Sequence, residues 1–397
     1  MLKIKIGEVC DVYDGPHATP KKIDKGPVYL GIDAITDNGK LNPSGYNYLS
    51  EEDYKIWTKR VTPQYGDLVF SYEATLGRYA LIPKDFYGCL GRRLAVVRPK
   101  DERINIKWLY YYFLSPEWSV YIANNTVKGS TVNRISIEDF PNFYIPLLER
   151  TEQDKIVKVL SAIDEKIDNN VNINDNLSAM IDDIYCHTFL RTKHPNTWRI
   201  GKLSEVISQI NTGLNPRDNF VLGNGNIKYI TVKNLTANGT IDFTNCDTVD
   251  VTAQSIIHNR SDISVGDILF ASIAPLGRCY LINTEPKDWD INESVFSIRP
   301  NYQLISSEYL YSYFMSEYFV TKAQSSSTGS IFKGIRIGTL LDMDIVIPPF
   351  DIVEQFTNTT KSLFRLKQQC TDEAQQLIKL RNWLLPLLMN GQATIDD

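Results

Sequence analysis

The sequence predicts an α+β fold, in which two similar globular domains of mixed helix and strand are joined by two long helices that form a coiled coil. Two observations support this fold class. Apolar residues with heptad-like spacing occur in the middle of the chain and again at its end. The segments before them share a series of short motifs in the same order, about 200 residues apart, which indicates an internal repeat.

The first long helix is predicted for residues 151–194. Residues 151–190 contain no Pro or Gly, and as a helix they would span roughly 60 Å at about 1.5 Å per residue. The centre of the apolar seam is polar, and we interpret its two asparagines as contacts that fix the register of packed helices. The seam consists of Ile156, Leu160, Ile163, Ile167, Asn170, Asn174, Leu177, Ile181 and Ile184.

The second long helix is predicted for residues 351–397. Its seam has one residue every seven positions, namely Phe356, Leu363, Cys370, Leu377 and Leu384. Leu366, Leu380 and Leu387 are expected to lie on a flanking row. Because a helical seam needs a packing partner, we expect the two long helices to pack against each other.

The two globular domains are predicted for residues 1–150 and 195–350, which we call the first and second repeats. The matching motifs are Gly66-Asp67 with Gly266-Asp267, Gly77-Arg78 with Gly277-Arg278, Arg98-Pro99 with Arg299-Pro300, Ile145-Pro146 with Ile347-Pro348, and Glu152-Gln153 with Glu354-Gln355. The offset along this series moves from 200 to 202 residues. The loops between the motifs differ, which is typical of two related binding domains with different ligands.

Charge and cysteine content limit the possible classes of protein. The chain has a formal net charge of -5. Residues 151–190 contain eight acidic residues and three lysines, so this helix accounts for the whole net charge and the remainder is neutral. The six cysteines are scattered without a CxxC pair, which is typical of a reduced, cytoplasmic protein. No run of 18 apolar residues occurs, so we expect neither secretion nor a membrane span.

Catalytic motifs are absent from the sequence. It has no phosphate-binding P-loop, no GxGxxG after a strand and no HExxH, and its four histidines do not cluster. The stretch Ile347-Pro348-Pro349-Phe350 resembles the Pro-Pro-aromatic loop of amino-methyltransferases, but Ile347 stands where the Asn or Asp that holds the target amino group is required. We therefore predict that the chain is not an enzyme and that it binds no cofactor and no metal.

Basic residues in the predicted loops lie beside Gly, Ser, Thr and aromatic residues. Such side chains can bind phosphates, and Arg and Asn can read base edges in the major groove. The candidate DNA-binding residues of the first repeat are His17, Thr19, Lys21, Lys22, Tyr72, Arg78, Arg92, Arg93, Lys128, Ser130, Thr131 and Arg134. Those of the second repeat are Thr212, Arg217, Lys233, Asn234, Arg278, Ser330, Lys333 and Arg336.

The duplicated order of motifs resembles the specificity (S) subunits of type I restriction–modification systems. The resemblance rests on the Gly-Asp segment, the Gly-Arg turn, the Gly-Ser loop, Ile-Pro, and Glu-Gln at the start of a long helix. It implies that each globular half is a target-recognition domain that reads one half of a bipartite, asymmetric DNA target. It also implies that the two helices pack antiparallel, around an internal pseudo-twofold axis, and act as a spacer on which the modification subunits dock.

The same resemblance implies the partners and their cofactors. The partners are double-stranded DNA, two modification (methyltransferase) subunits and restriction (translocase/nuclease) subunits. S-adenosylmethionine and ATP with Mg²⁺ are expected on those subunits and not on this chain.

Two alternatives remain open. The chain could be the recognition subunit of another modification or phage-defence complex. It could also be a protein-binding scaffold built on a coiled coil, and this reading gains if Arg78, Arg92, Lys128, Arg134 and their counterparts in the second repeat do not share a face.

Overall fold

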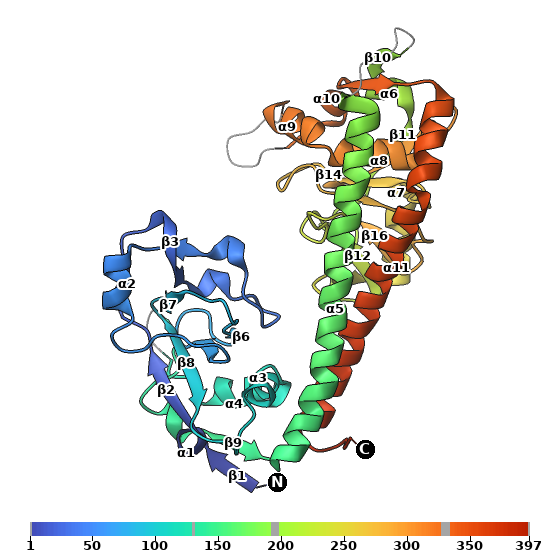
Figure 1. Ribbon diagram of the computed structural model, residues 1–397. Coiled ribbons are helices and arrows are strands. Elements are labelled where there is room, and N and C mark those ends of the chain that lie inside the picture. Colours follow the sequence, from blue (N-terminus) through green and yellow to red (C-terminus); the bar gives the residue numbers. More distant parts are fainter. Residues whose placement is uncertain (1, 129–131, 192–197, 327–333, 396–397) are drawn as a thin grey trace. The chain divides into compact units, whose positions relative to one another are not determined.

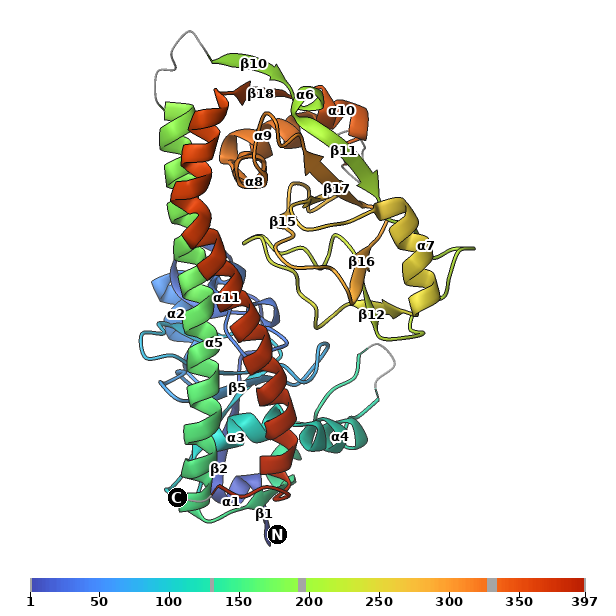
Figure 2. The ribbon, with the colours of Figure 1, turned by 90° about the vertical axis from the view of Figure 1, so that its right-hand side faces the viewer.

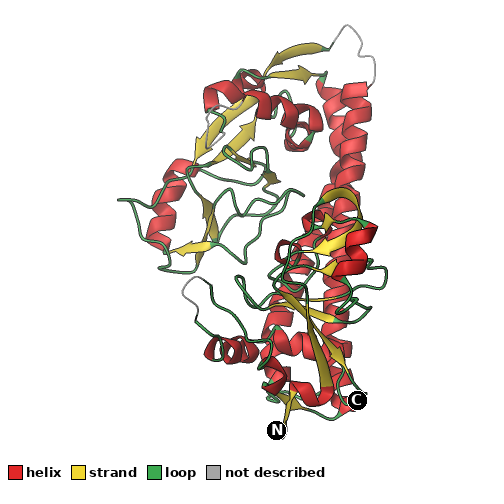
Figure 3. Cartoon of the chain, turned by 90° about the vertical axis from the view of Figure 1, so that its left-hand side faces the viewer, coloured by secondary structure: helices red, strands yellow, loops and turns green. Residues whose placement is uncertain are grey.

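The computed structural model describes residues 2–128, 132–191, 198–326 and 334–395. The chain divides into two compact units, which are described separately. Unit 1 comprises residues 1–166 and 376–397, and unit 2 comprises residues 167–375. Each unit therefore contains one globular repeat and one part of each long helix. Both repeats contain helices and strands (Figure 3).

Unit 1 begins with the first repeat and contains the start of helix α5. Its elements are β1 (Leu2–Lys5), α1 (Ile6–Val9), β2 (Cys10–Asp14), β3 (Ile23–Leu30), η1 (Ile32–Ala34), η2 (Pro43–Gly45), β4 (Asn47–Tyr48), α2 (Glu51–Trp57), β5 (Leu68–Ser71), β6 (Tyr79–Leu81), β7 (Gly88–Leu90), β8 (Leu94–Pro99), α3 (Ile106–Phe113), α4 (Pro116–Asn124), η3 (Phe140–Asn142), β9 (Tyr144–Leu147) and α5 (Arg150–Tyr185).

Unit 2 contains the second repeat, the end of α5 and the start of α11. Its further elements are the π-helical segment η4 (Cys186–Arg191), β10 (Arg199–Lys202), α6 (Leu203–Val206), β11 (Ile207–Thr212), β12 (Ile227–Ile230), β13 (Asp247–Val249), α7 (Val251–Ser261), β14 (Ile268–Ala271), β15 (Cys279–Leu281), β16 (Trp289–Ile291), β17 (Val295–Pro300), α8 (Ser307–Met315), α9 (Glu317–Ser326), α10 (Ile337–Leu341), β18 (Asp344–Ile347) and α11 (Phe350–Met389).

The two repeats have the same sheet topology, which confirms the internal repeat. The first repeat contains sheets in the orders β1-β9, β2-β8-β5-β6 and β4-β3-β7, and the second contains β10-β18, β11-β17-β14-β15 and β13-β12-β16. In each repeat the four-stranded sheet is antiparallel, and one strand pair of the three-stranded sheet is parallel.

The repeated motifs serve this shared scaffold. Asp67, which follows Gly66, is buried and accepts two hydrogen bonds from Arg98, from Nε at 2.7 Å and from Nη2 at 2.6 Å. In the second repeat, Asp267 accepts the corresponding bonds from Arg299, at 2.7 and 2.8 Å. The Gly-Asp and Arg-Pro motifs therefore supply the two partners of one partly buried, bidentate ion pair, which links neighbouring strands of the four-stranded sheet.

The structure corrects part of the predicted alignment. Strands β9 and β18, and the first residues of α5 and α11, lie 200 residues apart and not 202. Pro146 lies within β9, opposite Lys3, whereas Pro348 follows the end of β18. The two Ile-Pro motifs are therefore not equivalent. Gln153 is likewise buried, with a hydrogen bond to the backbone amide of Asn105, whereas Gln355 is exposed.

The helices α5 and α11 lie side by side and run in opposite directions (Figures 1 and 2). Every predicted seam residue is buried or partly buried. In unit 2, the side-chain amide of Asn170 donates to Glu373 and that of Asn174 donates to Thr371, both at 2.9 Å. These bonds join the two helices through the polar centre of the seam.

The predicted flanking row of α11 is wrong at two positions. Leu366 and Leu380 are 43% and 41% exposed. The inward-facing row instead contains Val353, Thr360, Lys367 and Ala374, which are all buried. Helix α11 packs on a globular repeat as well as on α5. Its buried face is therefore wider than the seam of a two-helix coiled coil, and it includes other rows of residues.

Both units have cores that include the long helices. In unit 1, Ile156 and Leu160 of α5 and Leu388 of α11 join an aromatic cluster in which the rings of Phe113 and Trp118 stack 4.3 Å apart. In the described part of the chain, no helix has the length and apolar character needed to cross a bilayer. The six cysteines are free thiols.

Candidate nucleic-acid interface

Four loops of unit 1 meet at one end of the sheet β2-β8-β5-β6. One loop follows β2, one connects β5 to β6, and one connects β7 to β8; the fourth contributes residues 127–128 and 132–135. Backbone hydrogen bonds join them, from Gly15 to Leu94 at 2.9 Å, from Tyr72 to Arg93 at 3.1 Å and from Ile135 to Tyr72 at 2.7 Å. Segments that are far apart in the sequence therefore form one connected surface.

Most of the predicted basic and hydroxyl residues of the first repeat are exposed on these loops. His17, Thr19, Lys21, Lys22, Arg92, Lys128 and Arg134 are exposed. Two of the predicted residues have acidic neighbours, because His17 Nε2 lies 3.0 Å from Asp14 and Arg93 Nε lies 3.1 Å from Glu73. The exposed amines and guanidinium groups give this surface the chemistry needed to contact phosphates.

The second repeat builds the same arrangement with different residues. Backbone hydrogen bonds run from Gly213 to Asn292 at 3.2 Å, from Ser272 to Ser294 at 3.0 Å and from Ile335 to Ser272 at 2.8 Å. Among the predicted residues, Arg217, Lys233 and Arg336 are exposed and Thr212 is partly buried. The loop scaffold is therefore common to the two repeats, while the exposed side chains differ.

Several predicted residues are engaged inside the fold. Arg78 donates to Asp37 at 2.9 Å and to the carbonyl of Ile32 at 3.2 Å, and its counterpart Arg278 donates to the carbonyl of Leu235 at 2.9 Å. These arginines anchor a neighbouring loop of their own repeat.

Two further predicted residues, Tyr72 and Asn234, are only 4% exposed. The Asn234 side chain accepts from the backbone amide of Thr231 at 2.9 Å and donates to two backbone carbonyls, so it closes a loop. The burial of both residues does not suit contact with DNA. The predicted residues Ser130, Thr131, Ser330 and Lys333 lie outside the described residues.

Two exposed arginines that the sequence patterns did not single out occupy equivalent positions. Arg60 pairs with Asp14, and Arg260 Nε donates to Thr212 Oγ1 at 3.2 Å. Asp14 and Thr212 are the last residues of β2 and β11, and they pair with Ala95 and Phe296, which are equivalent in the two repeats. The spacing of 200 residues between the arginines was the available signal, because it matches the offset of the repeat.

One cluster in the second repeat resembles a hydrolytic site but is arranged differently. Buried Asp290 accepts a hydrogen bond from Ser261 at 2.7 Å and lies 3.3 Å from His258 Nδ1. Burial raises the pKa of the Asp290 carboxyl. Because the serine donates to the carboxylate and not to the imidazole, the histidine is not placed to activate it. Among the described residues, no group of three His, Cys, Asp or Glu side chains could hold a metal.

Comparison with known proteins assigns the chain to a family. The family model described as the type I restriction modification DNA specificity domain matches twice, at residues 2–179 and 195–376.

Two relatives come from Methanocaldococcus jannaschii. The specificity subunit of the type I restriction enzyme MjaIX is 21% identical, and the match covers 89% of this chain and 83% of that protein. The putative specificity subunit of MjaX is 22% identical, with 97% and 91% covered.

A solved structure shares the fold. The S subunit of a type I restriction–modification system from M. genitalium has a TM-score of 0.57 and 16% identity, with 98% of this chain and 96% of that chain covered. The predicted α+β fold with two similar domains is confirmed. Because the family model covers most of the chain in two copies, the chain belongs to the type I restriction modification DNA specificity family.

Proposed function

We propose that this chain is the non-catalytic DNA sequence-specificity subunit of a type I restriction–modification complex. Each repeat is a reader of one half of a bipartite, asymmetric DNA target. The observation that carries this proposal is the loop surface that both repeats build on the same scaffold. Two of the three backbone hydrogen bonds that join these loops are equivalent in the two repeats, while the exposed side chains differ, and this is what two readers of different half-sites require.

The first reader supplies the electrostatic feature that a scaffold protein would not need. Arg92 and Arg134 belong to neighbouring loops joined through the backbone of Tyr72 and Arg93, and Lys128 lies in the loop of Arg134. All three side chains are exposed, whereas Arg78, the fourth residue of this criterion, is bound to Asp37 and to the carbonyl of Ile32. Their shared surface favours DNA over a neutral protein ligand, because cationic groups on one face are the footprint of a polyanion.

The two long helices are proposed to carry the partner subunits and to set the distance between half-sites. Met180 of α5, and Leu366 and Trp383 of α11, are 51%, 43% and 62% exposed. These apolar side chains are available for contact with a partner subunit. Helix α5 has 36 residues, which corresponds to about 54 Å at 1.5 Å per residue and exceeds one turn of B-DNA, about 34 Å.

The proposed partners are double-stranded DNA, two modification subunits and restriction subunits. S-adenosylmethionine would be bound by the modification subunits, and ATP with Mg²⁺ by the restriction subunits. The recognition subunit of a different modification or phage-defence complex is a second candidate, since its DNA-reading surface would be the same.

The test is co-expression of the chain with the proteins encoded by neighbouring genes, followed by sequencing of methylated DNA. We expect the chain to co-purify with a methyltransferase and the DNA to carry a bipartite methylated motif that disappears when the chain is omitted. A methylated motif that persists without the chain would refute the proposal. Recovery of the methyltransferase without a restriction subunit would favour the second candidate.

A further inference from the structure

A buried lysine lies on the inward-facing row of α11. Lys367 is 7% exposed, and its neighbours on this row, Thr360 and Ala374, are also buried. Lysine is almost never fully buried unless it is paired, because removing its ammonium group from water is costly. An apolar side chain would fill the same position without that cost, so the contacts of the ammonium group need an explanation.

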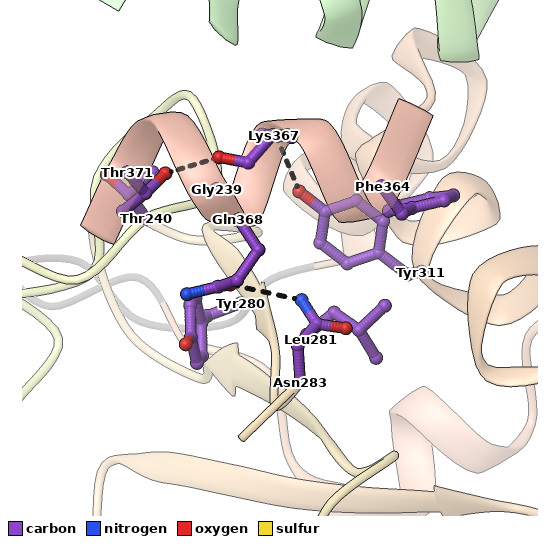
Figure 4. Close-up of a pocket in the computed structure, with 10 residues that line it drawn as sticks. All are labelled: Gly239, Thr240, Tyr280, Leu281, Asn283, Tyr311, Phe364, Lys367, Gln368 and Thr371. Atoms are coloured by element: carbon purple, nitrogen blue, oxygen red, sulfur yellow. Dashed lines mark hydrogen bonds between the residues drawn. The ribbon is translucent and has the colours of Figure 1, made fainter. Parts of the chain in front are cut away.

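The ammonium group of Lys367 holds a turn of the second repeat. Its Nζ donates to the backbone carbonyl of Asn238 at 2.8 Å and lies 3.4 Å from the hydroxyl of Tyr311. Figure 4 shows Lys367 beside the Tyr311 ring, with Gly239 behind the helix. Gly239 has φ +74°, and a Cβ atom there would lie 2.0 Å from the Tyr311 hydroxyl. The turn is therefore pressed closely against α8 and α11.

Neighbouring bonds from both long helices support the same contact. The side-chain amide of Asn238 donates to Asp175 of α5 at 3.5 Å. Asn283, which follows β15, donates to Gln368 of α11 at 3.3 Å (Figure 4). The loops of the second repeat are thus attached to the helix pair through polar contacts that require defined positions of both partners.

The first repeat uses a different contact at its equivalent turn. The hydroxyl of Tyr110 donates directly to the carbonyl of Gly39 at 2.9 Å. With the offset of 200 that relates the two helices, Ile167 of α5 occupies the position of Lys367. The lysine is therefore a feature of the second repeat and not part of the common scaffold.

We propose that Lys367 is a positioning residue that fixes the orientation of the second reader on the helix pair and thereby restricts the spacer length between the two half-sites. This proposal rests on the proposed function. Lys367 need not touch DNA to have this effect, because a change in the attachment of the turn at residues 236–240 reorients the whole reader.

The test compares Lys367→Met with Lys361→Met, which changes an exposed lysine of the same helix. Each variant is assembled with its modification subunits and given DNA substrates whose spacers differ by one base pair. Loss of a charge-assisted hydrogen bond predicts that the preference of wild type for one spacer falls about tenfold in Lys367→Met, with both half-site sequences unchanged. Lys361→Met should behave as wild type.

A conservative variant separates positioning from general damage. Arginine keeps a positively charged hydrogen-bond donor at this position, and Lys367 also lines a pocket of about 220 Å³ beside Ser312 and Met315. Lys367→Arg should therefore restore spacer selectivity. Failure of Lys367→Met to change the spacer preference would overturn the proposal, and so would an equal loss of selectivity in Lys361→Met.

A measurement without DNA distinguishes failure of this proposal from failure of the proposed function. Hydrogen exchange of residues 236–240 in the full chain should be faster in Lys367→Met than in wild type or Lys361→Met. Unchanged exchange would refute the attachment itself, whatever the DNA results. Faster exchange together with a wild-type complex that methylates no bipartite DNA would place the failure in the proposed function.

Discussion

Because Lys367 is buried, we expect the free energy of unfolding to depend on pH by an amount that can be calculated. Burial lowers the pKa of this side chain from 10.5 to about 8, while the negative charge of Asp175 acts in the opposite direction. In the unfolded chain the amine keeps its ordinary pKa. At neutral pH, a shift of this size means that the buried ammonium group lowers the free energy of unfolding by about 3 kcal/mol, since each pKa unit is worth about 1.4 kcal/mol.

The sign follows from which state binds the proton more tightly. Between about pH 8 and pH 10.5 the unfolded state binds more protons at this site, so the cost of the buried charge falls as the pH rises. The free energy of unfolding of wild type, relative to Lys367→Met, should therefore increase by about 2 kcal/mol between pH 7 and pH 10. Groups common to both proteins cancel in this difference.

Urea denaturation of both proteins at a series of pH values measures this quantity. The Lys361→Met variant is the control, because it removes an exposed lysine from the same helix and leaves Lys367 in place. A constant difference for Lys367→Met would refute the reasoning, since it would mean that the amine of Lys367 titrates as it does in water.

Three further predictions follow from other contacts. Replacement of Asp267 by Asn should lower the free energy of unfolding by about 3 kcal/mol, because the guanidinium of Arg299 loses its buried counter-charge. An unchanged midpoint of urea denaturation would contradict the structural role of the Gly-Asp motif. Arg60→Ala and Arg260→Ala should each weaken DNA binding by the assembled complex. Each should also reduce, by about 1, the slope of the logarithm of the binding constant against the logarithm of the salt concentration. Slopes equal to that of wild type would show that these arginines contact no phosphate. Asn174→Leu should add about 1 kcal/mol to the free energy of unfolding and so raise the thermal unfolding temperature, because the buried amide oxygen of Asn174 has no hydrogen-bond partner among the described residues. A lower unfolding temperature would mean that the bond from Asn174 to α11 contributes more than the unpaired oxygen costs.

The repeat and the long helices could be predicted because their signals are local and recur. The Gly-Asp and Arg-Pro motifs are visible in the sequence, and the structure explains them as one ion pair between Asp67 and Arg98, repeated as Asp267 and Arg299. A heptad-like seam similarly depends on spacing alone. These features require no knowledge of which distant residues meet.

The failures have a common physical origin in tertiary packing. The offset of 202 came from matching Ile-Pro motifs, but strand pairing places Pro146 inside β9 and Pro348 beyond β18. Leu366 was assigned to the row that flanks the seam because it is apolar, but it is exposed and the neighbouring Lys367 is buried. The sequence pattern does not show that the turn at Asn238 supplies a carbonyl to that lysine.

The candidate interface was partly predictable for the same reason. Loops rich in basic residues could be recognised from the sequence, and Arg92 and Arg134 are indeed exposed on adjoining loops. Burial could not be recognised, so Tyr72 and Asn234 were grouped with the exposed residues. Arg60 and Arg260 were missed because a lone arginine, whether it follows a short helix as Arg60 does or lies in the last turn of one as Arg260 does, carries no motif.

The most direct test of the central claim is an exchange of the first reader. Residues 1–150 would be replaced by those of a relative with a different target, the chimera would be assembled with the same modification subunits, and its methylated motif would be sequenced. Two independent readers predict that one half of the motif changes, while the other half and the spacer length stay as in wild type. A motif that is unchanged, or altered in both halves, would contradict the account.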